Sequence, residues 1–496
     1  MDFICNFPFF SIMISMFSGI VSSVLSRKAA KWLNTIAIFV IGGLSLALLF
    51  YINDTGAIIV YKMGHFPAPW GNEIRAGLLE AGLALFFCVI MLLSMTGGRK
   101  KLLGEVVEEK HNLYYILVDL MLASLLALIY TNDLFTAYVF VEINTISACG
   151  LIMIRQNGRT IEAAVRYMIM SLLGSGLLLM GICMLYDITG HLLMSNIKDA
   201  VSSLYNSGEY SVPLTVTIIL LTCGLAMKSA LFPFHTWVAD AYGYSTVSSA
   251  AILSSLVSKG YIILLIKIIY RVIGFEVYRA SRIIDVVFVF GLAGMIMGSL
   301  SAIRENDIRR MIAYSSVAQI GYIYMGIGLG TKYAMLASIF HILSHAATKS
   351  MLFIGAIGLT DVSKGSRHFA ELTGSGYRHK IAGVTFTVGA LSMVGVPLFS
   401  GFISKLLFAQ ASVLNQRKML PALIVLAIST ILNAIYFMKT VIRIYTPTEE
   451  EGDIITMKQE KVYAITCICF IILNFFLGMS SQPIVDWINA GIDMFA

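Results

Sequence analysis

The chain has 496 residues, of which 58% are hydrophobic and only 13% are charged, and its mean hydropathy is +0.83. Soluble proteins carry about 25% charged residues, so this composition excludes a soluble globular protein and indicates an integral membrane protein. The net charge of +7 does not indicate nucleic-acid binding, because the Lys and Arg residues lie in short loops between apolar runs and form no clustered basic face.

A helix needs about 20 apolar residues to cross a bilayer, and runs of this kind recur along the whole chain. They predict an all-α integral membrane protein with about fourteen transmembrane helices. The first run lacks a basic n-region and a cleavage site, so we expect it to be retained as a helix. The helix centres are expected near residues 14, 42, 86, 122, 144, 176, 221, 258, 292, 320, 346, 396, 430 and 470.

Most basic residues fall in the odd-numbered loops, which the positive-inside rule places in the cytoplasm. Both termini would then lie outside the cytoplasm. The eighth loop, with Arg271, Arg279 and Arg282, is an exception that this pattern does not explain. The basic residues of the odd loops are Arg27, Lys28 and Lys31; Arg99, Lys100 and Lys101; Arg155, Arg159 and Arg166; Arg304, Arg309 and Arg310; and Lys364, Arg367, Arg378 and Lys380.

Two apolar helices are interrupted by proline, at Pro233 and at Pro397. Each is the fourth span of a five-span block, one near residues 112–275 and the other near 283–445. Paired broken helices at corresponding positions are typical of transporters built from inverted repeats.

The seven cysteines lie almost entirely within apolar stretches and form no CxxC pair, so we interpret them as small buried hydrophobic residues. Because iron–sulfur ligation needs grouped thiolates, we predict no cofactor in this chain. Before the last span, the acidic residues Glu449, Glu450, Glu451 and Asp453 are expected to form a solvated loop. The tail after that span is expected to be short, about twenty residues.

Four charged residues lie within apolar runs, where a central Lys or Asp costs about 2.5–3.5 kcal/mol to insert. They are Glu142, Lys228, Lys259 and Lys405. Snorkelling near helix ends or ion pairing between helices would explain one such residue, but four in one chain favour a functional interpretation. A Glu–Lys pair that separates and rejoins would release and bind a proton, as an ion pump requires.

His341, His345 and Lys349 recur every four residues along one expected helix, which places them on one face at steps of about 6 Å. One water can bridge such a step, so the stripe is suited to proton transfer. Zinc is the alternative, but Ile342 stands where an HExxH motif has Glu, no third ligand is evident, and we predict no metal. His235, just after Pro233, is a further candidate because a broken helix exposes backbone polar groups to a cavity.

Four ordered motifs give the chain its resemblance to a known family. It resembles the antiporter-like subunits shared by respiratory complex I, Mrp-type sodium/proton antiporters and membrane-bound hydrogenases. The resemblance covers roughly residues 110–445, together with the stripe from His341 to Lys349. The motifs are Asn132-Asp-Leu-Phe-Thr-Ala-Tyr-Val-Phe-Val-Glu142, Lys228-Ser-Ala-Leu-Phe-Pro-Phe-His-Thr-Trp237, Asp307-Ile-Arg-Arg-Met-Ile-Ala-Tyr-Ser-Ser316 and Gly395-Val-Pro-Leu-Phe-Ser-Gly-Phe-Ile-Ser-Lys405.

The resemblance implies fourteen helices with two inverted five-helix repeats, each containing a broken helix. It divides the chain into three N-terminal helices (1–110), a first repeat (111–275), a second repeat (283–445) and a last helix with a short tail (446–496). By resemblance, Glu142 modulates Lys228, Lys259 and the histidine stripe link the halves, and Lys405 is the terminal proton donor.

One motif departs from the family. Where relatives carry Leu-Pro-Asp-Ala-His after the first break, this chain reads Val238-Ala-Asp-Ala-Tyr242. The resemblance therefore does not determine the shape of the proton entry at this break. Among subtypes, the first motif and the short tail look most like the D-type member of Mrp or hydrogenase-linked assemblies.

These features predict a subunit of a multisubunit complex in the cell membrane that translocates protons, with Na⁺ as the second candidate ion. The partners would be other membrane subunits and lipid, and no nucleic acid. No redox or hydrolytic site is evident in this chain, so the driving force is either redox chemistry in a partner or an ion gradient, as in an Mrp antiporter. An independent solute transporter and a structural scaffold are the alternatives.

Overall fold

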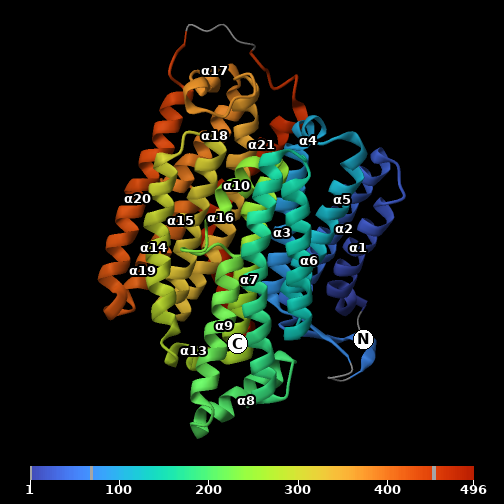
Figure 1. Cartoon of the computed structure of the whole chain (residues 1–496), viewed down its shortest axis with the longest axis vertical. Helices are drawn as coiled ribbons and strands as arrows, with labels where there is room; N and C mark the ends of the chain where they lie inside the picture. The colour runs from blue at the N-terminus through green and yellow to red at the C-terminus, as the bar shows by residue number, and fades with distance from the viewer. Residues whose placement is uncertain (1–2, 67–70, 449–453, 496) are drawn as a thin grey trace.

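The computed structural model describes residues 3–66, 71–448 and 454–495, and it is a bundle of long, roughly parallel helices (Figure 1). The acidic residues Glu449, Glu450, Glu451 and Asp453 lie outside the described residues. Among those described, twelve helical segments are long and apolar enough to cross a membrane, which confirms an all-α membrane protein. The count of fourteen stays a prediction, since α15 and the α18–α19 pair are not among the twelve.

Twelve of the predicted centres lie within the long helices; of the other two, residue 258 lies in the segment Val247–Ile273 and residue 396 falls in the turn between α18 and α19. The long helices are α1 (Phe7–Ser22), α2 (Arg27–Thr55), α3 (Leu78–Gly97), α5 (His111–Tyr130), α6 (Leu134–Met153), α7 (Gly158–Thr189), α9 (Ser211–Lys228), α14 (Ile283–Arg304), α15 (Ile308–Leu329), α16 (Lys332–Asp361), α18 (Lys380–Val394), α19 (Ser400–Val413), α20 (Gln416–Ile444) and α21 (Lys461–Met479).

Shorter elements connect or extend them. These are η1 (Phe3–Asn6), α4 (Arg99–Glu105), η3 (Glu108–Lys110), α8 (Met194–Ser207), α10 (Val238–Tyr244), α13 (Phe275–Ala280), η6 (Phe369–Leu372), α17 (Ser375–Arg378) and α22 (Ser481–Phe495). Between α2 and α3, a small antiparallel hairpin pairs β1 (Ile59–Lys62) with β2 (Glu73–Ala76), and η2 (Met63–His65) follows β1.

The helices begin and end where local chemistry satisfies their backbone groups. Asp133 accepts a hydrogen bond from Thr136 N at the start of α6, and Thr331 accepts one from Ala334 N at the start of α16. Gly330 ends α15 in the left-handed conformation, with φ +68°, which favours glycine.

Two segments form the buried centre of the bundle. One is α16, and the other runs from Val247 to Ile273; all residues in the most apolar part of each are buried. The second segment consists of α11 (Val247–Ile252), the π-helical turn η4 (Leu253–Val257), α12 (Ser258–Lys267) and the π-helical η5 (Ile268–Ile273). It packs against α16 through α11 and η4. The two buried segments, one with Lys259 and the other with the stripe from His341 to Lys349, therefore meet at the centre of the protein.

Both predicted breaks occur. Helix α9 ends at Lys228 and the chain turns through Pro233 before α10 begins at Val238. Helix α18 ends at Val394, Gly395 has φ +90°, and α19 begins at Ser400. The inverted relation between the two blocks stays a prediction.

Candidate functional site

Lys228 and Glu142 form an ion pair beside the first break. Lys228 is the last residue of α9, and its Nζ lies 3.4 Å from Glu142 Oε1 on α6. Nζ also donates to Thr145 Oγ1 at 2.8 Å and to Ser171 Oγ at 3.0 Å. An ammonium has three donors, so these three partners satisfy Lys228 completely. The Lys228 side chain is fully buried, whereas that of Glu142 is 26% exposed, so the pair connects the interior with the edge of the bundle.

Hydroxyl groups hold both members of the pair. Ser175 Oγ on α7 donates to Glu142 Oε1. Tyr261 on α12 lies with its ring 5.6 Å from Lys228 Nζ, and its hydroxyl donates to Asn144 Oδ1 at 3.0 Å. The same hydroxyl lies 3.4 Å from Thr145 Oγ1, which places a polar group of the central segment against the Lys228 environment.

Lys259 lies two residues before Tyr261 on the central segment and is fully buried. Its Nζ donates to the carbonyl of Ser254, inside the π-helical turn η4. A π turn shifts the i→i−4 hydrogen-bonding pattern, so it leaves a carbonyl available for a side chain. Lys259 interacts electrostatically with His341, His345 and Lys349 across the contact with α16.

The predicted stripe on α16 is buried and continuous. The rings of His341 and His345 stack at 5.8 Å between centroids, and His341 Nδ1 lies 2.5 Å from Ser404 Oγ on α19. Neither ring nitrogen of His345 has a hydrogen-bond partner among the residues that the structure describes. Lys349 donates to the carbonyl of Ile312 at 3.0 Å and to Ser315 Oγ, both on α15. The unpartnered imidazole nitrogens leave acceptor and donor capacity for water along this stripe.

Lys405 stands at the second break. Its Nζ donates to Val394 O, at the end of α18, at 2.7 Å. The ring of Tyr322 lies 5.8 Å from this Nζ and stacks on His341 at 5.5 Å. Tyr322 therefore connects Lys405 with the stripe on α16.

The structure does not bring all the predicted residues into contact. His235 lies in the first break, 5.3 Å ring to ring from Phe232, and its Nδ1 is unpartnered. Within the described parts of the chain, no hydrogen bond joins Lys228 directly to Lys259, or Lys349 to Lys405. Those steps need water or side-chain movement. The described residues also contain no group of three His, Cys, Asp or Glu arranged to hold a metal ion.

Other buried charges were not predicted. Asp119, in the middle of α5, is fully buried and accepts hydrogen bonds from Ser18 Oγ at 2.8 Å and Asn34 Nδ2 at 2.6 Å. Lys267 donates to three carbonyls at the end of α5, those of Leu128, Ile129 and Thr131. Both residues lie within apolar runs, so the criterion that identified Lys228 would also have identified them.

Comparisons with known proteins show the family to which the chain is similar. The family model described as "NADH:quinone oxidoreductase/Mrp antiporter, TM" matches residues 131–432. The N-type NADH-quinone oxidoreductase subunit of Desulforudis audaxviator is 30% identical over 89% of this chain and 86% of the relative. The D-type Na(+)/H(+) antiporter subunit of Alkalihalophilus pseudofirmus is 25% identical over 94% of this chain and 92% of the relative.

Among solved structures, a chain of the membrane-bound sulfane sulfur reductase, an archaeal respiratory membrane complex, superposes with a TM-score of 0.88 at 25% identity. The match covers 99% of this chain and 97% of that chain. The fold described above is therefore shared over nearly the whole chain.

Proposed function

The chain belongs to the NADH:quinone oxidoreductase/Mrp antiporter transmembrane family, and from this premise we propose that it is the proton-translocating subunit of a multisubunit membrane complex. The relatives above are subunits of such complexes by name, which supports other membrane subunits as partners. The observation that carries the proposal is the Glu142–Lys228 pair, at 3.4 Å, at the end of a broken helix.

In the first half, the pair controls the charge of Lys228. When Glu142 is close, its carboxylate and two hydroxyls stabilise the ammonium. When Glu142 moves away, the buried ammonium loses its counter-ion and the low dielectric favours release of the proton. Tyr261 lies on the central segment, two residues after Lys259, and it contacts the Lys228 environment, so the released proton moves toward Lys259.

In the second half, the proton passes along α16. Lys259 interacts electrostatically with His341, His345 and Lys349 across the contact with α16, and Tyr322 connects His341 to Lys405. Water fills the steps that have no direct hydrogen bond. Lys405, at the second break and partly exposed, is the terminal donor. His235 lines the proton entry at the first break.

The two blocks, residues 111–275 and 283–445, act as the two repeats of this path, with the described parts of residues 1–110 and 446–496 packed beside them. We place the protein in the cell membrane with its basic loops in the cytoplasm. The chain ends lie toward the end of the bundle opposite α4 and α17, which supports termini outside the cytoplasm (Figure 1).

The test uses the complete native complex in everted membrane vesicles, with proton uptake followed by a pH-sensitive dye. Lys228→Met and Glu142→Gln should each lower proton transport about tenfold or more, because a lost buried charge interaction exceeds about 1.4 kcal/mol. Lys458→Met, an exposed lysine outside the bundle, is the matched control. Normal transport in Lys228→Met with intact assembly would exclude this path, and loss of assembly alone would favour a scaffold.

A gradient-driven Na⁺/H⁺ antiporter is the second candidate, and the similarity to a relative named as a Na(+)/H(+) antiporter subunit favours it specifically. Purifying the tagged complex and measuring its iron separates the two. Iron–sulfur partners would make this the pump of a redox complex, whereas small membrane subunits without iron would make it part of an antiporter.

A further inference from the structure

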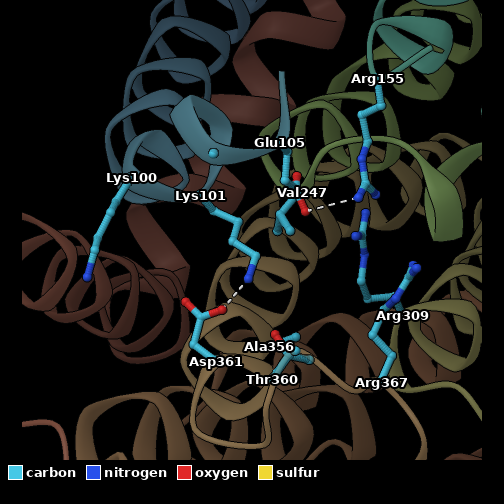
Figure 2. A pocket seen from close by; sticks show the side chains of 12 residues that line it. Lys100, Lys101, Glu105, Arg155, Val247, Arg309, Ala356, Thr360, Asp361 and Arg367 are labelled. Atoms are coloured by element: carbon cyan, nitrogen blue, oxygen red, sulfur yellow. Dashed lines mark hydrogen bonds and ion pairs between the residues drawn. The ribbon is translucent and has the colours of Figure 1, made fainter. Parts of the chain in front are cut away.

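A cavity of about 390 Å³ opens on the face that carries the basic loops. Its lining comes from separate parts of the chain: α4, the segment after α6, the starts of α11 and α15, the end of α16 and the loop after it. Figure 2 shows Arg155, Arg309 and Arg367 on one side of the cavity, and Lys101 with Asp361 on the other. The third, fifth, ninth and eleventh loops thus meet at one site.

The lining of the cavity is rich in cations, although Lys100 pairs with Glu460 and Arg367 lies 3.8 Å from Asp307, two carboxylates outside the lining. Five basic residues line it against two carboxylates, Glu105 and Asp361. Asp361 pairs with Lys101, and Glu105 lies 3.8 Å from Arg155. The basic lining residues are Lys100, Lys101, Arg155, Arg309 and Arg367.

Backbone carbonyls hold the three arginines in place. Arg155 donates to Tyr244 O at 3.0 Å, and Arg367 donates to Gly243 O at 2.7 Å. Arg309 donates to the carbonyls of Tyr242 and Ser245. These carbonyls fix the three guanidinium groups in the lining, and a carbonyl carries no net charge. Arg155 and Arg367 each also lie 3.8 Å from one carboxylate oxygen, of Glu105 and of Asp307, whereas Arg309 has no ion pair among the described residues. An arrangement of this kind is preorganised for an anion.

Two buried atoms of the lining residues have no hydrogen-bond partner within the described part of the chain. Arg309 is 3% exposed, forms no ion pair among the described residues, and its Nε has no hydrogen-bond acceptor. Glu105 Oε2 is also buried without a donor. Buried polar groups without partners are rare in native proteins and point to an absent ligand or water. A ligand that satisfied both would present an anionic oxygen to Arg309 and a hydroxyl to Glu105.

We propose that this cavity binds a phosphate ester that carries free hydroxyl groups, either the headgroup of an anionic glycerophospholipid or a soluble sugar phosphate. Guanidinium forks bind phosphate oxygens in pairs, which fits the three arginines. The hydroxyl groups distinguish this ligand class from bare anions, since they supply the donor that Glu105 lacks. A metal cation does not fit, because the basic residues outnumber the carboxylates.

The experiment uses the delipidated complex in detergent, with native mass spectrometry and thermal unfolding as readouts. Phosphatidylglycerol and glycerol 3-phosphate are the two probes, and phosphatidylcholine is the neutral lipid control. Arg155→Gln and Arg367→Gln, both partly exposed, should each weaken binding about tenfold or more through loss of a charged hydrogen bond. Arg166→Gln, on the same face but lining a different cavity, should leave binding unchanged.

Binding of phosphatidylglycerol but not glycerol 3-phosphate would identify a lipid headgroup, and the reverse would identify a soluble ligand. Binding of neither probe, or binding unaffected by Arg155→Gln and Arg367→Gln, would show that the cavity holds only water and overturn the proposal. If one arginine variant fails to assemble, the other provides the same comparison.

Discussion

The guanidinium of Arg271 forms a buried ion pair with the carboxylate of Glu80, and both side chains are only 2% exposed. Arg271 Nε also donates to Phe495 O at 3.2 Å, and its guanidinium lies 4.1 Å from the Phe495 ring. The pair therefore joins α3, the end of the central segment and α22. It also removes Arg271 from the basic eighth loop, since Arg271 points into the protein and is not a topology signal, whereas Arg279 and Arg282 are exposed and keep the loop an exception.

Removing one member of this pair should destabilise the protein strongly. Glu80→Gln leaves the Arg271 charge buried without a counter-ion, which costs about 3–5 kcal/mol. Thermal unfolding and proteolytic release of α22 measure the effect. The double variant Glu80→Gln/Arg271→Gln should recover part of the loss, because it buries no unpaired charge. Lys332→Ala, which breaks the exposed pair with Asp493, is the control and should cost about 1 kcal/mol or less. Equal stability of Glu80→Gln and the control would contradict this account.

The buried carboxylate of Asp119 should serve structure and not transport. Asp119→Leu leaves Ser18 and Asn34 without acceptors, at about 1–3 kcal/mol for each unsatisfied group. Asp119→Asn retains an acceptor oxygen and should unfold at a temperature closer to that of the native protein. In everted vesicles, Asp119→Asn should translocate protons normally. A stable Asp119→Asn variant without transport would instead place Asp119 on the ion path.

The sequence was sufficient to predict the breaks at Pro233 and Pro397 and the candidate charges within spans, because proline and buried charge are local signals. It could not show that Arg271 turns inward, since its partner Glu80 lies 191 residues away. The π-helical turn at 253–257 was also not predictable, because the segment holds no Pro or Gly that would mark an irregular turn, and the turn packs against α16, which lies far away in the sequence. The D-type assignment stays a prediction, since relatives of the N type and of the D type both match.

The position of Lys405 should depend on Gly395. A Cβ at Gly395 would lie 2.9 Å from Lys405 Cδ, so Gly395→Ala should displace the lysine from Val394 O. Gly190→Ala is the matched control: both glycines have positive φ, +90° and +72°, but a Cβ at Gly190 meets nothing within 4 Å. Both variants should lose about 1–2 kcal/mol of stability to backbone strain. Only Gly395→Ala should slow proton transport in vesicles; equal transport by the two would show that this placement of Lys405 is unimportant.

Glu460 should make stability depend on pH on the basic face. Its carboxylate lies 2.5 Å from Lys100 Nζ and 3.4 Å from His379 Nε2. Burial raises the pKa of Glu460, but the hydrogen bonds from Lys100 and His379 outweigh burial and hold the pKa below its ordinary value of 4.5. A carboxylate with a depressed pKa stabilises the fold above its unfolded pKa, and this contribution is lost as the pH falls through the folded pKa.

Glu460→Gln should therefore lower the unfolding temperature at about pH 7, and the difference from the native protein should shrink at about pH 4 and below. Glu371→Gln, at an exposed position of the same face, is the control and should change little at either pH. A difference between Glu460→Gln and the native protein that stayed constant down to low pH would mean that packing, and not the charge of Glu460, stabilises this site. The pH comparison therefore separates the stability that comes from the ion pairs of Glu460 with Lys100 and His379 from the stability that comes from side-chain packing at the start of α21.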